Sequence, residues 1–123
     1  MQPVPHRPLS EAEAGVLRAA VSSSAVAHFP VDLEEAIKDA VVRTVCGCGC
    51  ASLGFTEASE PDPVGTRLVA DAMAFRPGSK SEWVGILVYA APQGLVEMEI
   101  HTPFDGPALL PDPDAVQAWP VDL

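Results

Sequence analysis

Apolar residues recur at helical spacing close to the start of this chain. Ser10 is followed three residues later by Glu13, which forms a capping box and predicts that a helix begins here. The serine run that follows and Pro30 oppose helix, so the helix is predicted to end near Ser23. The apolar residues that recur at helical spacing after this cap are Ala12, Val16, Ala19 and Ala20. A second, short helix is predicted after Asp32, which can serve as its N-cap.

Beyond residue 40 the pattern changes to that of β-strands. The β-branched "VVRTV" leads into "VCGCGCASLGF", and together they predict one long strand that bends at a glycine. Three further strands are predicted at "TRLVADAMAFR", "EWVGILVYAA" and "LVEMEIHT". The connections "PGSKS" and "PQG" have the length and composition of hairpin turns, so these strands form an antiparallel meander.

The side-chain sizes on these strands predict how the layers pack. Leu68, Ala70, Ala72 and Ala74 form a face of mostly small residues, which lets a helix approach closely. The strand at residues 82–91 is apolar on both faces, so both faces should be covered. The Pro-rich segment 103–123 is expected to cross the second face and to cover it with Leu109, Leu110 and Trp119.

We therefore expect an α+β fold. One or two N-terminal helices pack on a four-stranded, mainly antiparallel sheet, and the Pro-rich C-terminal tail lies over the other face. Residues 1–123 are expected to form a single domain, with residues 1–9 as an irregular arm and residues 103–123 as the tail. One helical turn is expected to open at Asp112, with Pro113 in its first position.

Charge narrows the classes of partner. Seventeen acidic residues against seven basic ones give a formal net charge of -10. This charge repels nucleic-acid phosphates and anionic membranes, so neither is an expected partner, whereas a basic protein would be attracted. The chain has no apolar run of membrane-spanning length and no secretory signal pattern. The lack of a membrane-length apolar run predicts a soluble protein. Three cysteines are too few for a disulfide framework, which predicts a reducing compartment such as the cytoplasm.

The three cysteines are the strongest chemical signal in the chain. In an extended strand Cys46, Cys48 and Cys50 point the same way, with successive α-carbons about 6.7 Å apart. That spacing is too wide for one metal ion, and parallel side chains disfavour a disulfide between neighbours. We therefore expect three reduced, partly buried thiols with a structural role. Curling at Gly47 and Gly49 is the alternative conformation, which would bring the sulfurs together.

A metal site would use Cys46, Cys48 and Cys50 as its ligands. Three closely spaced thiols suit Cu(I) better than zinc, which normally needs a fourth ligand from His6, His28, His101 or a carboxylate. Catalysis is not expected, because no base lies next to the cysteines in the sequence and Arg43 is the nearest positive charge.

The leading hypothesis is a small acidic, non-catalytic binding protein that needs no cofactor. It is motivated by the absence of any nucleophile–base pair, phosphate loop or paired ligand motif. The alternative is a soft-metal (Cu or Zn) binding or thiol redox protein. The Cys46–Cys50 run, "GILVYAAPQGLVEMEI" and "LLPDPDAV" together resemble small bacterial proteins of actinobacterial type with a Cys-Gly-Cys strand, a resemblance that implies an α+β fold and no particular activity.

Overall fold

The two predicted helices are present in the computed structural model, which describes residues 1–24 and 32–120. Helix α1 spans Glu11–Ser23 and helix α2 spans Leu33–Asp39. The Ser10 hydroxyl accepts the backbone N–H of Glu13 at 3.1 Å, and the Glu13 carboxylate accepts the N–H of Ser10 at 2.8 Å. Asp32 caps α2 by accepting the N–H of Glu35. Both predicted caps are therefore confirmed.

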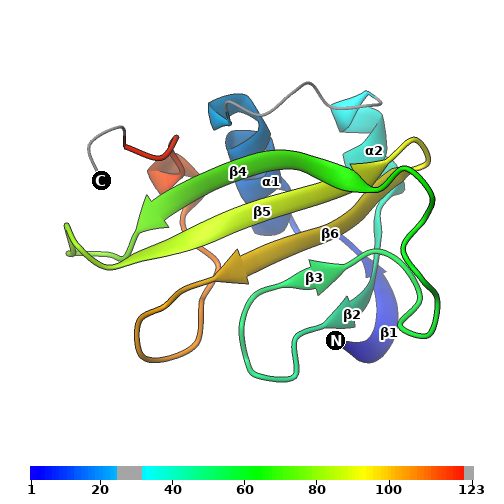
Figure 1. Cartoon of the computed structure of the whole chain (residues 1–123), viewed down its shortest axis with the longest axis horizontal. Helices are drawn as coiled ribbons and strands as arrows, with labels where there is room; N and C mark the ends of the chain where they lie inside the picture. The colour runs from blue at the N-terminus through cyan, green and yellow to red at the C-terminus, as the bar shows by residue number, and fades with distance from the viewer. Residues whose placement is uncertain (25–31, 121–123) are drawn as a thin grey trace.

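The strands form one antiparallel sheet of six, in the order β1-β2-β3-β6-β5-β4. They are β1 (Gln2–Pro8), β2 (Val41–Val45), β3 (Leu53–Gly54), β4 (Arg67–Phe75), β5 (Trp83–Ala91) and β6 (Gly94–His101). The α+β class and the meander β4-β5-β6 are confirmed (Figure 1). The prediction of four strands is wrong.

Two segments account for the extra strands. The predicted irregular arm is instead the edge strand β1, which pairs with β2 between Gln2 and Val45 at one end and Pro8 and Val41 at the other. Its prolines are tolerated there because an edge strand leaves one row of its backbone groups unpaired. The predicted long cysteine strand is divided: β2 ends at Val45, a turn follows, and β3 is a separate pair of residues beside β6.

Both helices lie on one face of the sheet, behind the strands in the view of Figure 1. Helix α1 packs against β4 and β5, where Ala70, Ala72 and Ala74 are completely buried. Val16 and Leu17 of α1 are also fully buried in this core. The small side chains on β4 thus allow the close helix–sheet approach that the sequence predicted.

The C-terminal segment does not cross the second face of the sheet, so that prediction is wrong. Its predicted turn is confirmed as the 3-10 helix η1 (Pro113–Ala115), which lies against α1. Gln117 then pairs with Met73 on the outer edge of β4, through backbone hydrogen bonds of 3.0 and 2.8 Å. The unpaired edge of β4 offers backbone donors and acceptors, and these fix the segment beside the sheet.

Of the residues predicted to cover the second face, only Trp119 reaches it. Its indole N–H donates to Asp71 at 2.8 Å, and its ring meets Trp83 edge-on with centroids 4.8 Å apart. Leu109 is 65% exposed, and Leu110 packs against the core on the helix side.

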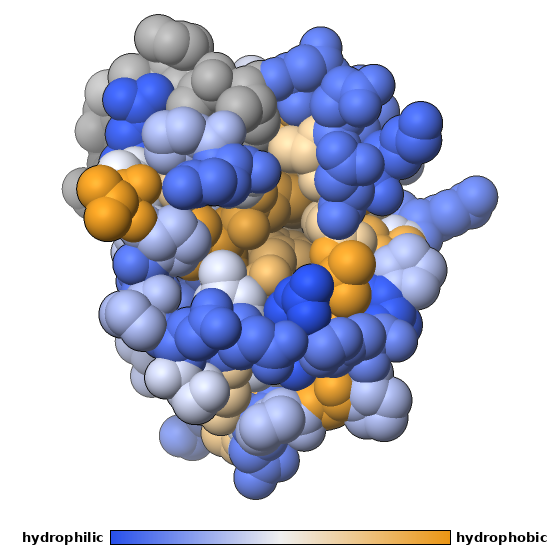
Figure 2. Space-filling view, turned by 90° about the vertical axis from the view of Figure 1, so that its right-hand side faces the viewer, coloured by the Kyte–Doolittle hydropathy of each residue, from blue (hydrophilic) through white to orange (hydrophobic). Residues whose placement is uncertain are grey.

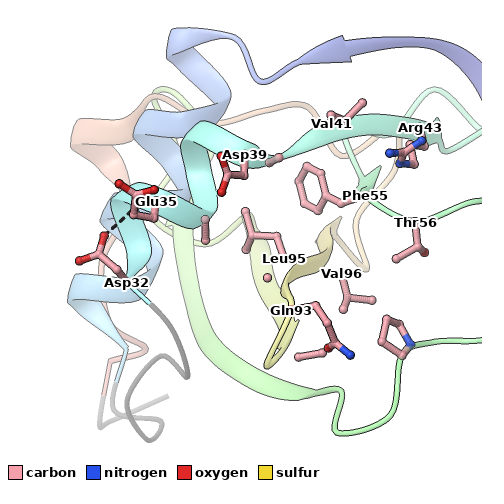
Figure 3. Close-up of a pocket in the computed structure, with 15 residues that line it drawn as sticks. Asp32, Glu35, Asp39, Val41, Arg43, Phe55, Thr56, Gln93, Leu95 and Val96 are labelled. Atoms are coloured by element: carbon pink, nitrogen blue, oxygen red, sulfur yellow. Dashed lines mark hydrogen bonds between the residues drawn. The ribbon is translucent and has the colours of Figure 1, made fainter.

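Two cavities open at opposite ends of β5. One lies beside α2 and has a volume of about 380 Å³. Figure 2 shows an apolar hollow with a polar rim on this side of the molecule, and Figure 3 shows the residues that line it. The other, of about 820 Å³, lies between the β4–β5 hairpin and residues 105–115. No helix within the described ranges has the length and apolar character needed to cross a membrane.

Candidate metal centre

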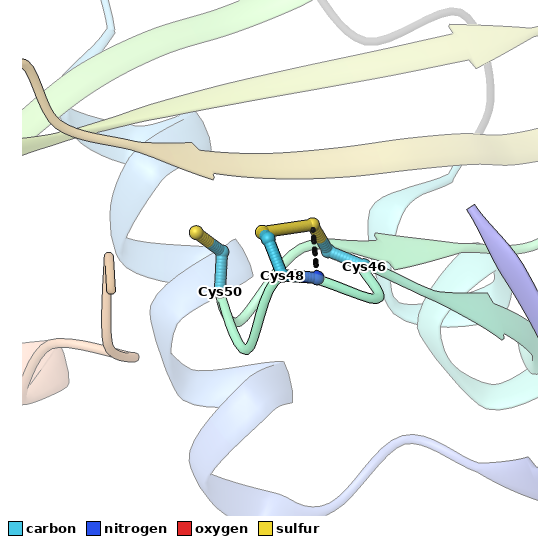
Figure 4. Close-up of side chains that lie close together, drawn as sticks. All are labelled: Cys46, Cys48 and Cys50. Atoms are coloured by element: carbon cyan, nitrogen blue, oxygen red, sulfur yellow. Dashed lines mark hydrogen bonds between the residues drawn. A yellow bond between two sulfur atoms is a disulfide. The ribbon is translucent and has the colours of Figure 1, made fainter. Parts of the chain in front are cut away.

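The three cysteines lie on a tight turn between β2 and β3 (Figure 4). The chain leaves the sheet after Val45 and turns at residues 47–49, where Gly49 has a φ of +90°. This backbone conformation is favourable only for a residue without a β-carbon. The α-carbons of Cys46 and Cys48 are 5.4 Å apart, closer than the separation expected of a flat strand. The predicted extended conformation is therefore wrong, and the alternative, curled conformation is present.

Curling brings the three sulfur atoms together. All three lie within 4.8 Å of one another, and Figure 4 shows the side chains projecting to the same side of the turn. Cys46 and Cys48 are joined as a disulfide, and Cys50 is a free, half-buried thiol. The expectation of three reduced thiols fails for a geometric reason: the turn rotates Cys46 and Cys48 toward each other, whereas a strand would hold their side chains parallel.

Contacts from distant segments hold the turn in place. A β-carbon on Gly47 would meet the side chain of Gln2 in β1 at 2.8 Å, so this glycine allows β1 to approach. The backbone N–H of Ala108 donates to the Cys50 sulfur at 3.5 Å, and the carbonyl of Ala108 accepts the N–H of Ala51 at 2.8 Å. The C-terminal loop is thereby connected to the turn on both sides of the Cys50–Ala51 peptide bond.

Ser52 fixes the exit of the turn. Its buried hydroxyl accepts the N–H of Ile100 at 2.9 Å and donates to the carbonyl of Ile100 at 3.2 Å. The hydroxyl therefore satisfies both backbone groups of Ile100 in β6 just before β3 begins. No local pattern of residues indicates the roles of Gln2, Ser52 and Ala108, because each acts through a partner more than forty residues away.

No histidine or carboxylate joins the sulfur cluster within residues 1–24 and 32–120. His6 lies 3.2 Å from the Arg43 guanidinium and 3.5 Å from the Glu57 carboxylate. His101 lies edge-on to Trp83, with ring centroids 6.0 Å apart. His28 falls outside the described residues. The ligand set that the turn offers is thus made of sulfur alone.

In the described part of the chain, no basic side chain forms a hydrogen bond with the three sulfur atoms. Arg43, the nearest positive charge in the sequence, forms an ion pair with Glu57 at 2.8 Å. The polar contacts to the sulfurs come from backbone N–H groups, those of Cys48 to Cys46 at 3.4 Å and of Ala108 to Cys50. These contacts position the Cys46–Cys48 disulfide and the Cys50 thiol, whose three sulfur atoms would become soft thiolate ligands only after reduction of the disulfide.

Comparisons of this chain with protein-family models, with curated proteins and with solved structures find no match.

Proposed function

We propose that this protein is a non-catalytic binding protein and that its reduced cysteine turn binds Cu(I). The observation that carries the proposal is the convergence of the Cys46, Cys48 and Cys50 sulfurs within 4.8 Å on five consecutive residues. Three thiolates bound to one ion at metal–sulfur distances of about 2.3 Å would lie about 4 Å apart, so a small adjustment of the turn suffices.

The donor set favours Cu(I) over zinc. A closed structural zinc site takes four protein ligands, and the described residues place only three sulfurs together. Cu(I) is a soft ion that is well satisfied by two or three thiolates. Within residues 1–24 and 32–120 the cluster contains sulfur ligands alone, which matches copper more closely than zinc.

The disulfide between Cys46 and Cys48 represents the oxidised form, which cannot use these sulfurs as thiolate ligands. A low-molecular-weight dithiol would supply the two electrons and two protons that convert the disulfide to two thiols, and would itself become a disulfide. Binding of Cu(I) then displaces protons from the cysteine thiols as they become thiolates. In this proposal the oxidation state of the turn controls whether it can bind metal.

The test is an anaerobic titration of the reduced protein with Cu(I) against a chromophoric Cu(I) chelator. We expect one tightly bound Cu(I) per chain, none in the oxidised protein, and weaker binding in the single variants Cys46→Ser, Cys48→Ser and Cys50→Ser. A reduced wild-type protein that fails to compete with the chelator would refute the proposal. Circular dichroism of each variant distinguishes loss of a ligand from loss of the fold.

Thiol–disulfide exchange is a second candidate function, favoured by the position of Cys50 within 4.8 Å of both disulfide sulfurs. The Cys50 thiolate would attack the Cys48 sulfur, forming a Cys48–Cys50 disulfide and releasing Cys46 as a thiolate, without any external oxidant. Alkylation of the oxidised protein followed by peptide mapping tests this step. Exchange predicts label on Cys46 as well as Cys50, whereas label on Cys50 alone excludes it.

We also infer that the protein has a basic protein partner. Acidic residues outnumber basic ones by ten, and four of the arginines are already paired with glutamates. The remaining carboxylates leave a strong negative potential that attracts a basic surface. Association with a cationic probe protein that weakens as salt is raised tests this inference, and no association at low salt would refute it.

A further inference from the structure

We propose that the cavity beside α2 receives a lysine or arginine side chain of a basic partner protein. This assignment rests on the proposed basic partner and names the part of the surface that it would contact. The cavity combines an apolar floor with carboxylates along one rim, and a long basic side chain has the complementary arrangement of an aliphatic stem and a charged head.

The floor of the cavity is built from three elements. Phe55 follows β3, Leu95 and Val96 belong to β6, and Ala36 and Ala40 belong to the α2 segment. These side chains are almost completely buried, so the floor is a fixed part of the core. A volume of about 380 Å³ falls in the range of cavities that bind ligands and accommodates an extended basic side chain.

The rim beside α2 carries negative charge that has no partner in the described part of the chain. Asp32, Glu35 and Asp39 line this side in Figure 3. Asp32 is engaged as the N-cap of α2, but neither the Glu35 nor the Asp39 carboxylate forms a hydrogen bond or ion pair within residues 1–24 and 32–120. A cation in the cavity would provide the missing partner.

The opposite rim does not cancel this charge. Arg43 lines the cavity, but its guanidinium is held at 2.8 Å from the Glu57 carboxylate. The cavity therefore presents an excess of negative charge above an apolar floor, which favours a cation with an apolar stem over an anionic or a purely apolar occupant.

The surface next to the cavity favours a protein over a small cation. Pro63 lines the cavity, and the following residue, Val64, is 90% exposed. The same loop carries Glu60 and Asp62. A partner protein that inserts one basic side chain can also cover Val64 and meet these acidic residues, whereas a small cation confined to the cavity can do neither.

The test uses the ¹⁵N-labelled full chain and the synthetic peptide acetyl-Leu-Arg-Leu-Arg-Leu-amide, followed by NMR at physiological salt. The matched control peptide replaces each arginine by citrulline, which has a similar shape but no charge. We expect the arginine peptide to shift the amide signals of residues around Phe55, Leu95 and Val64, and the citrulline peptide to bind at least about tenfold more weakly.

Matched variants distinguish the effect of the carboxylates at the cavity rim from the effect of the protein's overall charge. Glu35→Gln/Asp39→Asn removes two carboxylates from the rim and leaves the Asp32 cap intact, and we expect it to weaken peptide binding about fivefold or more. Asp105→Asn/Asp114→Asn makes the same change in charge at the other cavity, at the far end of β5, and should leave binding nearly unchanged.

Three outcomes would overturn the assignment, and they differ in what they imply. If both double variants weakened peptide binding equally, or if the amide shifts mapped away from the cavity, the protein would still have a basic partner, but the partner would not bind in this cavity. No binding of the arginine peptide at any salt concentration would refute both the site and the proposed partner. Binding of n-butylguanidinium as tight as that of the peptide would identify a small-cation site instead of a protein-docking site.

Discussion

Cys50 and Ala108, 58 residues apart in the chain, are joined by a hydrogen bond of 3.5 Å from the Ala108 N–H to the Cys50 sulfur. The Ala108 carbonyl also accepts the N–H of Ala51, so the C-terminal loop holds the third cysteine next to the other two. The candidate metal centre therefore depends on tertiary contacts as well as on the spacing of its cysteines.

The number of reactive thiols tests the structure of the turn directly. We expect one thiol in the denatured, unreduced protein, since Cys46 and Cys48 are bonded to each other, and three after reduction. The Cys50→Ser variant should show none before reduction and two afterwards. Titration with a coloured thiol reagent makes the measurement, and three thiols in fresh, unreduced protein would show that the disulfide does not form.

Replacing Gly49 by alanine should impair the metal centre through the backbone. At a φ of +90° an added β-carbon destabilises the backbone conformation by about 1–2 kcal/mol. The alanine variant would relieve this strain by shifting to a more open turn. Gly78→Ala is the matched control, because Gly78 also has a positive φ, of +75°, and lies in the β4–β5 hairpin. Both variants should lose similar stability in urea unfolding, but only Gly49→Ala should lose Cu(I) affinity. Equal affinity in the two variants would contradict the importance of the turn.

The ion pair between Arg7 and Glu13 should make stability depend on acid pH. The Arg7 guanidinium binds both carboxylate oxygens of Glu13 at 2.8 Å, and this pairing lowers the pKa of Glu13. A lowered folded-state pKa gives stability that is present above the unfolded-state pKa of about 4.3 and is lost as the pH falls through the folded value.

Glu13→Gln keeps the capping hydrogen bond but removes the ion pair. At pH 7 we expect it to lower the free energy of unfolding by about 0.5–1 kcal/mol, and by progressively less as the pH falls through the lowered folded-state pKa of Glu13. Glu11→Gln, in the same helical turn, is the control for helix-dipole effects. Urea unfolding from pH 7 to acid pH provides the measurement, and a deficit that does not shrink as the pH falls would exclude the ionic mechanism.

Glu97 should show the opposite dependence on pH. Burial raises its pKa, as do the nearby charges of Glu99 and Asp62. The ionised carboxylate is therefore unfavourable in the folded state, and its cost appears as the pH rises through the raised pKa.

Glu97→Gln should consequently stabilise the protein at pH 7 by about 0.5 kcal/mol, a figure limited by solvent screening of this partly exposed group. The gain should vanish at low pH, where both folded and unfolded states are protonated. Glu60→Gln, at an exposed loop position, should have little effect at either pH. Thermal unfolding at pH 7 and pH 3 makes the comparison, and a destabilised Glu97→Gln protein at pH 7 would contradict it.

Elements that depend on residues close together in the chain could be predicted from the sequence alone. Ser10 and Glu13 are three residues apart and form their capping box within one helical turn, so the start of α1 could be read directly. The short Gly- and Pro-containing connections fixed the meander β4-β5-β6, because a short turn leaves adjacent strands no other arrangement. The alternating small residues of β4 indicated which face α1 would cover.

Features whose interacting residues lie far apart in the chain depend on long-range contacts that only the folded protein shows. Gln2–Pro8 became a strand because β2 offered it a free edge, and the C-terminal segment followed the edge of β4 because Met73 was available to pair with Gln117. The glycines at 47 and 49 permitted both an extended and a curled conformation of the cysteine segment. Contacts of the turn with β1, β6 and Ala108 favour the curled one, since these long-range packing and hydrogen-bond energies are absent from any local pattern of residues.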